Sequence, residues 1–143
     1  MIAYLSQSFI FESAHTLHRQ VPLVEFEPSM RVHGHTYTAE ITFSGEVCQE
    51  GMIQVERKGR KKEPLDLFLV RKIIGEVKLL LDHRMLDNIP NLGTPTLENL
   101  CIFIGSFAGF NDLPLHRVCI SRATGDKCEI FWGTKQCENP SKP

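Results

Sequence analysis

The sequence lacks a long apolar run and an excess of charge of either sign. Its longest apolar stretch, around residues 97–110, is too short and too polar to cross a bilayer, because it is interrupted by Glu98, Asn99, Gly105, Ser106 and Gly109. With 16 basic and 17 acidic residues, the chain has no overall field that favours nucleic acid or a membrane surface. We therefore expect neither kind of partner.

The sequence also lacks the features of a secreted protein. Its five cysteines are an odd number and form no CxxC pair, so free thiols in a reducing compartment are the expected state. Residues 1–5 contain no basic region, and no cleavage-site pattern follows them. These observations predict a cytoplasmic protein.

What is present is the size and composition of one globular domain. The chain has 143 residues, of which 42% are hydrophobic and 23% charged. No repeat or composition shift marks a boundary, so we predict a single domain over residues 1–138. The Pro- and polar-rich residues 139–143 are expected to form a loose tail.

Alternation with a period of two predicts the strands. Residues 3–13 favour a first strand, and residues 35–43 alternate apolar and polar side chains as a half-buried strand does. Ser44-Gly45 then predicts a turn into a partner strand at about 46–55. Residues 118–121 and 128–132 predict two more strands around Gly125-Asp126.

Two segments have helical periodicity. Residues 65–81 repeat apolar side chains at three- and four-residue steps. Thr94 is expected to cap a second helix, with Pro95 at its first position and an apolar stripe through residues 97–108. The order of elements predicts an α+β domain with the helices on one face of a sheet.

A run of charged residues, 56–63, lies between the strands and the first helix. It predicts a hairpin extension at about 54–65. The tip of that hairpin is either a solvated turn or an arm that binds phosphate or a partner.

Three histidines form a pattern that suits a metal. In an extended chain, His33 and His35 point to the same side because they are two residues apart. His15 lies just past the first strand and would fall beside His35 if the two strands pair antiparallel. Three imidazole nitrogens at about 2.0–2.1 Å would fill three positions of a tetrahedral zinc ion and leave the fourth for a substrate. The alternative is a polar loop with surface histidines.

Two other clusters could contribute to catalysis or binding. Asp82 could orient His83 as a general acid or base, although the same pair is also typical of a helix C-terminus. Glu98 falls in the first turn of the second helix, where the helix dipole favours a carboxylate whatever its function.

Together these residues resemble the 6-pyruvoyltetrahydropterin synthase and 6-carboxytetrahydropterin synthase family. The matching motifs occur in the family's order and are Phe11-Glu-Ser-Ala-His15, His33-Gly-His35-Thr-Tyr37, Gly51-Met-Ile53, Leu81-Asp-His83 and Pro95-Thr-Leu-Glu-Asn99. The resemblance implies the tunnelling fold, in which a four-stranded antiparallel sheet carries two helices on one face and the strands assemble into a multimeric barrel. It also implies a homo-oligomer, commonly a hexamer, with active sites at subunit boundaries.

The resemblance further implies a chemistry and residue roles. The family acts on 7,8-dihydroneopterin triphosphate, removing triphosphate and rearranging the side chain. His15, His33 and His35 match the family's zinc ligands, and Asp82 and His83 match its proton relay. Beside these matches, Thr96, Glu98 and Arg122 are the candidate substrate contacts in this chain.

Three departures from the family distinguish this chain. The reactive cysteine that usually precedes the HGH motif is absent, and Glu27 or Ser29 stands in its place. Glu27 is the candidate replacement base, because apolar neighbours favour a raised carboxyl pKa. Arg122 replaces the glutamate that accepts hydrogen bonds from the pterin. The third departure is the charged insertion at 54–65.

These departures leave two hypotheses. The first is a zinc-dependent lyase acting on 7,8-dihydroneopterin triphosphate or a close relative, with Glu27 as its base. The second is a non-catalytic or repurposed protein that keeps zinc as an anchor for a pterin- or purine-like ligand. Arg122, which has five donors and no acceptor, would favour a carboxylate, a phosphate or another acceptor edge.

Overall fold

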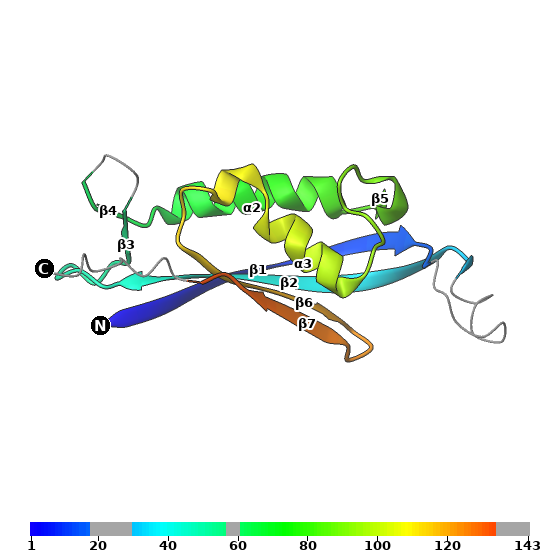
Figure 1. The fold of residues 1–143 in the computed structure, drawn as a ribbon, viewed down its shortest axis with the longest axis horizontal. Coiled ribbons are helices and arrows are strands. Elements are labelled where there is room, and N and C mark those ends of the chain that lie inside the picture. Colours follow the sequence, from blue (N-terminus) through cyan, green and yellow to red (C-terminus); the bar gives the residue numbers. More distant parts are fainter. Residues whose placement is uncertain (18–29, 57–60, 134–143) are drawn as a thin grey trace, which may run out of the picture.

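The computed structural model describes residues 1–17, 30–56 and 61–133. Its main sheet has five strands in the order β5-β1-β2-β6-β7. They are β1 (Ile2–His15), β2 (His33–Glu46), β5 (Arg84–Met85), β6 (Leu115–Arg122) and β7 (Lys127–Phe131). Figure 1 shows β1 and β2 as the long central pair of this sheet.

The prediction of a sheet with four antiparallel strands is wrong, because the sheet has a fifth strand. Four strands are antiparallel neighbours, but β5 adds a short parallel pairing with β1 through Ser13 and Ala14. The chain reaches this position because His83 takes a left-handed backbone conformation, with φ of 56°, and donates its N–H to the Glu12 carbonyl at 2.7 Å. A two-residue strand has no periodicity that a sequence pattern could reveal.

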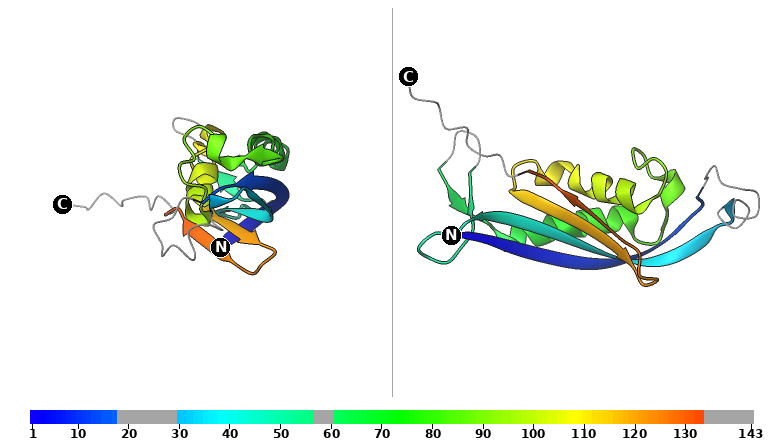
Figure 2. Two further views of the ribbon diagram at one scale, coloured as in Figure 1. Left: turned by 90° about the vertical axis from the view of Figure 1, so that its right-hand side faces the viewer. Right: turned by 60° about the horizontal axis from the view of Figure 1, so that its bottom comes forward.

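Two helices cover one face of the sheet, as Figure 1 and the end-on view in Figure 2 show. Helix α2 (Leu67–Leu81) begins after Asp66, whose side chain accepts the N–H of Phe68 at 2.8 Å. It therefore starts two residues later than the apolar pattern predicted. Helix α3 (Leu97–Gly105) is capped by Thr96, which accepts the N–H of Asn99 at 3.2 Å. The expected cap at Thr94 is wrong, because Pro95 precedes the cap.

The predicted partner strand at 46–55 is also wrong. Ser44 does not turn the chain, because it stays paired with Tyr4 and donates its N–H to the Pro114 carbonyl. The strand β2 continues to Glu46, and only the two-residue β3 (Gln54–Val55) follows, paired with β4 (Glu63–Pro64). These two short strands form the base of the charged extension, whose residues 57–60 lie outside the described chain.

The alternating apolar side chains of the strands pack against the apolar faces of the helices and form one core between the sheet and the helices. The side chains that are fully buried there include Phe11, Tyr37, Ala39, Ile41, Phe43, Val70, Val77, Leu81, Leu86, Leu100, Ile104, Val118 and Ile120. In β1 and β2 this apolar alternation continues into Ser13, His15 and His35. The end of the same face is therefore polar, and it carries the candidate site.

Within residues 1–17, 30–56 and 61–133, no helix has both the length and the apolar character needed to span a bilayer.

Candidate metal centre

The three predicted ligand histidines meet at one end of the β1–β2 pair. Strand register places His15 directly opposite His33, with His35 two residues farther along β2. His15 thus lies inside the strand and beside His33, not past its end and beside His35 as expected. The ring centroids are 4.4 Å apart for His15–His33, 5.2 Å for His15–His35 and 5.1 Å for His33–His35.

The nitrogens of these rings are close enough to share one ion. One potential ligand atom from each histidine lies within 4.8 Å of the other two. Within the part of the chain that the structure describes, this is the one group of three or more potential ligands that converges in this way. No cysteine belongs to the group, which is unlike a structural zinc site closed by four protein ligands.

Backbone carbonyls orient two of the rings. The Nδ1–H of His15 donates to the Pro95 carbonyl at 3.1 Å, and the Nδ1–H of His33 donates to the Arg31 carbonyl at 2.8 Å. Each bond leaves Nε2 as the ring's lone-pair nitrogen, which is the usual arrangement in a metal-binding histidine whose other ring nitrogen donates to a carbonyl. The Nε2 atom of His15 is buried without a hydrogen-bond partner. A metal ion would satisfy this otherwise costly atom, so the residues fit a zinc ion.

Burial and neighbouring charges favour the neutral imidazole at His15 and His35. Burial lowers the pKa of His15, and the neighbouring His33 and His35 lower it further. Burial also lowers the pKa of His35, together with the Arg122 guanidinium and His33. Because the neutral ring is the metal-binding form, these shifts favour the metal-binding form of His15 and His35.

Asp87 is a residue near the cluster that the sequence did not indicate. It accepts hydrogen bonds from the Thr16 N–H at 2.8 Å and from the Thr16 hydroxyl. Burial works to raise the pKa of Asp87, but these bonds and the nearby His15 lower it overall. The resulting carboxylate interacts electrostatically with the buried His15. Its position follows from the short 3-10 helix η1 (Leu86–Asn88), which no sequence pattern marked.

Arg122 lies beside the histidines. It pairs with Tyr37 across β2 and β6, and its Nη1 is 3.3 Å from Nε2 of His35. Its Nη2 is 2.8 Å from a carboxylate oxygen of Asp126 in the β6–β7 turn. The structure thus brings together His35 and the arginine that departs from the family pattern.

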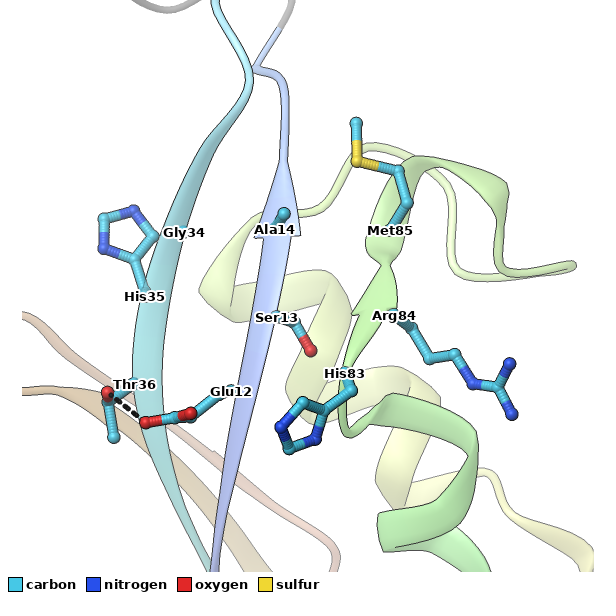
Figure 3. Close-up of a pocket in the computed structure, with 9 residues that line it drawn as sticks. All are labelled: Glu12, Ser13, Ala14, Gly34, His35, Thr36, His83, Arg84 and Met85. Carbon is cyan, nitrogen blue, oxygen red and sulfur yellow. Dashed lines mark hydrogen bonds between the residues drawn. The ribbon is translucent and has the colours of Figure 1, made fainter.

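Asp82 and His83 form the expected pair but do not join the metal cluster within one chain. The Asp82 carboxylate accepts the Glu12 N–H at 2.9 Å and lies 3.1 Å from Nδ1 of His83. Hydrogen bonding to Glu12 lowers the pKa of Asp82, and His83 lowers it further. The His83 side chain is 77% exposed. Figure 3 shows strands β1 and β2 between its ring and that of His35.

An open hollow of about 600 Å³ is lined by residues of both parts, although His15 and His33 are not among them. Its lining includes Glu12, Gly34, His35, His83 and Arg84. In Figure 3 the His83 ring points across the sheet towards Glu12. The hollow is open to solvent within one chain.

The remaining predicted site residues are less closely connected. The Thr96 hydroxyl caps α3, and Glu98 is exposed in the first turn of that helix. Capping of α3 accounts for Thr96, and the helix dipole accounts for Glu98, without a role for either residue in the site. Glu27 and Ser29 lie outside the described residues.

Comparison with known proteins identifies the family. The family model described as 6-pyruvoyl tetrahydropterin synthase matches residues 4–130. The chain belongs to this family of pterin-metabolising enzymes. The family resemblance inferred from the sequence motifs is thereby confirmed.

Two curated relatives and a solved structure are similar to this family member. A protein of Archaeoglobus fulgidus assigned as a 6-carboxy-5,6,7,8-tetrahydropterin synthase is 30% identical over 100 residues, covering 70% of this chain and 76% of the relative. The dihydroneopterin monophosphate aldolase of Pyrococcus furiosus is 26% identical over 125 residues, covering 85% and 91%. The 6-pyruvoyl tetrahydropterin synthase of Caenorhabditis elegans superimposes with a TM-score of 0.72 at 22% identity, covering 93% of this chain and 97% of that one, and so shares the fold.

Proposed function

We propose that this family member is a zinc-dependent lyase acting on 7,8-dihydroneopterin triphosphate or a close relative. The observation that carries the proposal is the convergence of His15, His33 and His35, with a buried Nε2 atom of His15 that has no other partner. Three protein ligands leave a zinc ion one position for a substrate.

The ligand histidines and the relay pair have separate tasks. When bound, zinc supplies Lewis-acid stabilisation for negative charge that develops on substrate oxygens. The carbonyls of Pro95 and Arg31 hold two rings in the tautomer that presents Nε2. Asp82 accepts the Nδ1–H of His83, so the Nε2 atom of His83 is free to take up or release a proton.

The separation of the relay from the metal cluster supports a site shared between subunits. We propose a homo-oligomer, with a hexamer as the expected state. Among the described residues, β5 covers only Ser13 and Ala14 of the β1 edge, and β7 forms the other edge. Exposed apolar side chains lie on these edge strands, namely Ile2, Tyr4, Ile10 and Phe131. Edge pairing between copies would cover them and close a barrel.

An assay of triphosphate release tests the proposal. Zinc-loaded protein is expected to release triphosphate from 7,8-dihydroneopterin triphosphate, whereas His33→Ala should not. Asp112→Asn is the control, because Asp112 is exposed in the connection between α3 and β6 and belongs to neither the metal cluster nor the relay. Wild-type turnover no faster than that of His33→Ala would refute lyase activity on this substrate.

A second candidate function is a zinc-containing binding protein without turnover, for a pterin- or purine-like ligand. Arg122 favours it, since a guanidinium has no acceptor for the pterin N–H groups that the family's glutamate binds. Calorimetric binding of 7,8-dihydroneopterin to zinc-loaded protein, with no product detected, would support it. Product formation would exclude it.

A further inference from the structure

Arg122 has donors that lack an oxygen acceptor. Its Nη2 is paired with Asp126, but its Nε atom is buried and has no hydrogen-bond partner. Its Nη1 lies against Nε2 of His35 at 3.3 Å. An arginine is always charged and has no acceptor atom, so each of these N–H groups requires a lone pair from elsewhere.

Metal binding would remove one acceptor that Arg122 has. Neutral imidazole offers one lone pair, and His35 cannot give it both to Arg122 and to a metal. If Nε2 of His35 is the ligand atom, the Nη1–H of Arg122 loses its partner when the metal binds. The positively charged guanidinium is then left close to a metal dication, which is bound to the ring nitrogen that Nη1 now contacts.

The existing carboxylate does not compensate for this charge. Asp126 carries one negative charge and is 55% exposed, and it is held in its turn by Thr124 and by its own backbone bond to Arg122. It pairs with Nη2 and leaves Nε and Nη1 without a carboxylate partner. A ligand edge made of N–H groups would add donors where donors are already in excess. An anionic oxygen satisfies both the guanidinium and the metal.

We infer that Arg122 and the metal held by His15, His33 and His35 form one subsite for an anionic oxygen, so that the preferred ligand presents a phosphate or carboxylate beside the metal. This inference rests on the proposed metal site and specifies its ligand class. Arg122 is a specificity-determining residue that replaces recognition of a donor edge by recognition of an acceptor.

The test uses the full chain loaded with Co²⁺, whose visible absorption reports changes in its ligands. Inorganic phosphate and acetate are titrated separately, which distinguishes a phosphate from a carboxylate preference. At least one anion should change the spectrum of the wild type. In Arg122→Gln its affinity should fall about 10- to 100-fold with the cobalt content unchanged. Arg122→Lys keeps the charge but loses the planar fork and should fall in between.

A matched substitution at an exposed arginine of α2, Arg71→Gln, should leave the titration unchanged. Equal affinity of wild type and Arg122→Gln overturns the inference. So does a wild type that binds cobalt but neither anion, while the proposed metal site then still stands. A wild type that binds no metal overturns both.

Discussion

The imidazole of His15 donates to the backbone carbonyl of Pro95, a residue 80 positions away in the sequence, at 3.1 Å. This bond joins the end of β1 to the residue before the α3 cap. It fixes the ring so that its buried Nε2 faces His33 and His35. The packing of α3 on the sheet and the geometry of the metal cluster are therefore coupled.

Zinc should stabilise the protein through these histidines. A ligand present at 1,000 times its Kd stabilises the native state by about 4 kcal/mol. We expect zinc to raise the thermal midpoint of the wild type and of Asp112→Asn, but not that of His33→Ala. Differential scanning fluorimetry with and without zinc measures this. An equal rise in His33→Ala would place the metal elsewhere.

The stability of the metal-free protein should fall in acid. The pKa values of His15 and His35 lie below their ordinary value of 6.5 in the folded state, so the unfolded chain binds more protons once the pH drops below about 6.5. This contribution to stability is full above pH 6.5 and is lost as the pH falls towards the folded pKa values. Urea unfolding between pH 8 and 5 measures it. His15→Gln should show a weaker pH dependence, and an unchanged one would contradict the assignment.

Removing the charge of Asp82 should affect turnover and spare the metal. In Asp82→Asn the amide oxygen can still accept the Glu12 N–H, but the negative charge beside His83 is lost. General acid–base catalysis contributes about 10²- to 10⁴-fold, so we expect kcat to fall within that range with zinc content unchanged. Asp112→Asn, at an exposed position, is the control. Full activity in Asp82→Asn would exclude the relay role.

The N-cap of α3 can be located by substitution. Thr96→Ala removes the acceptor of the Asn99 N–H and should cost about 1 kcal/mol of unfolding free energy. Thr94→Ala should have little effect, because Asn99 binds the Thr94 backbone carbonyl and not its side chain. Chemical denaturation of both variants decides between the two caps. A larger loss in Thr94→Ala would restore the position predicted from sequence.

Two helix glycines should respond in opposite directions. A Cβ at Gly105 would lie 2.0 Å from a ring atom of Trp132, so Gly105→Ala should destabilise by about 1–3 kcal/mol. A Cβ at Gly75 in α2 would meet nothing within 4 Å, and Gly75→Ala should stabilise by about 0.5–1 kcal/mol. The two thermal midpoints, measured side by side, check the packing of α3 against the residue after β7.

Strong local periodicity made most of the fold predictable. The alternation through residues 35–43 and the three- and four-residue steps through 65–81 each reflect one buried face, so they identified β2 and α2. The predictions that were wrong lie where pairing between distant segments overrides the local sequence preference. Ser44-Gly45 looks like a turn, yet the pairing of Ser44 with Tyr4 continues the strand. Strand β5 is too short for any pattern.

The histidine motif itself was readable, because residues two apart on a strand share a face. The sequence by itself determined which residue types are available: three imidazoles, an Asp–His pair, and an arginine in place of an acidic anchor. Only the tertiary structure decided that His15 pairs with His33, that Asp87 and Pro95 reach His15, and that Arg122 lies against His35. Those contacts depend on strand register and on the path of the chain between α2 and α3, which are set by packing between residues distant in sequence.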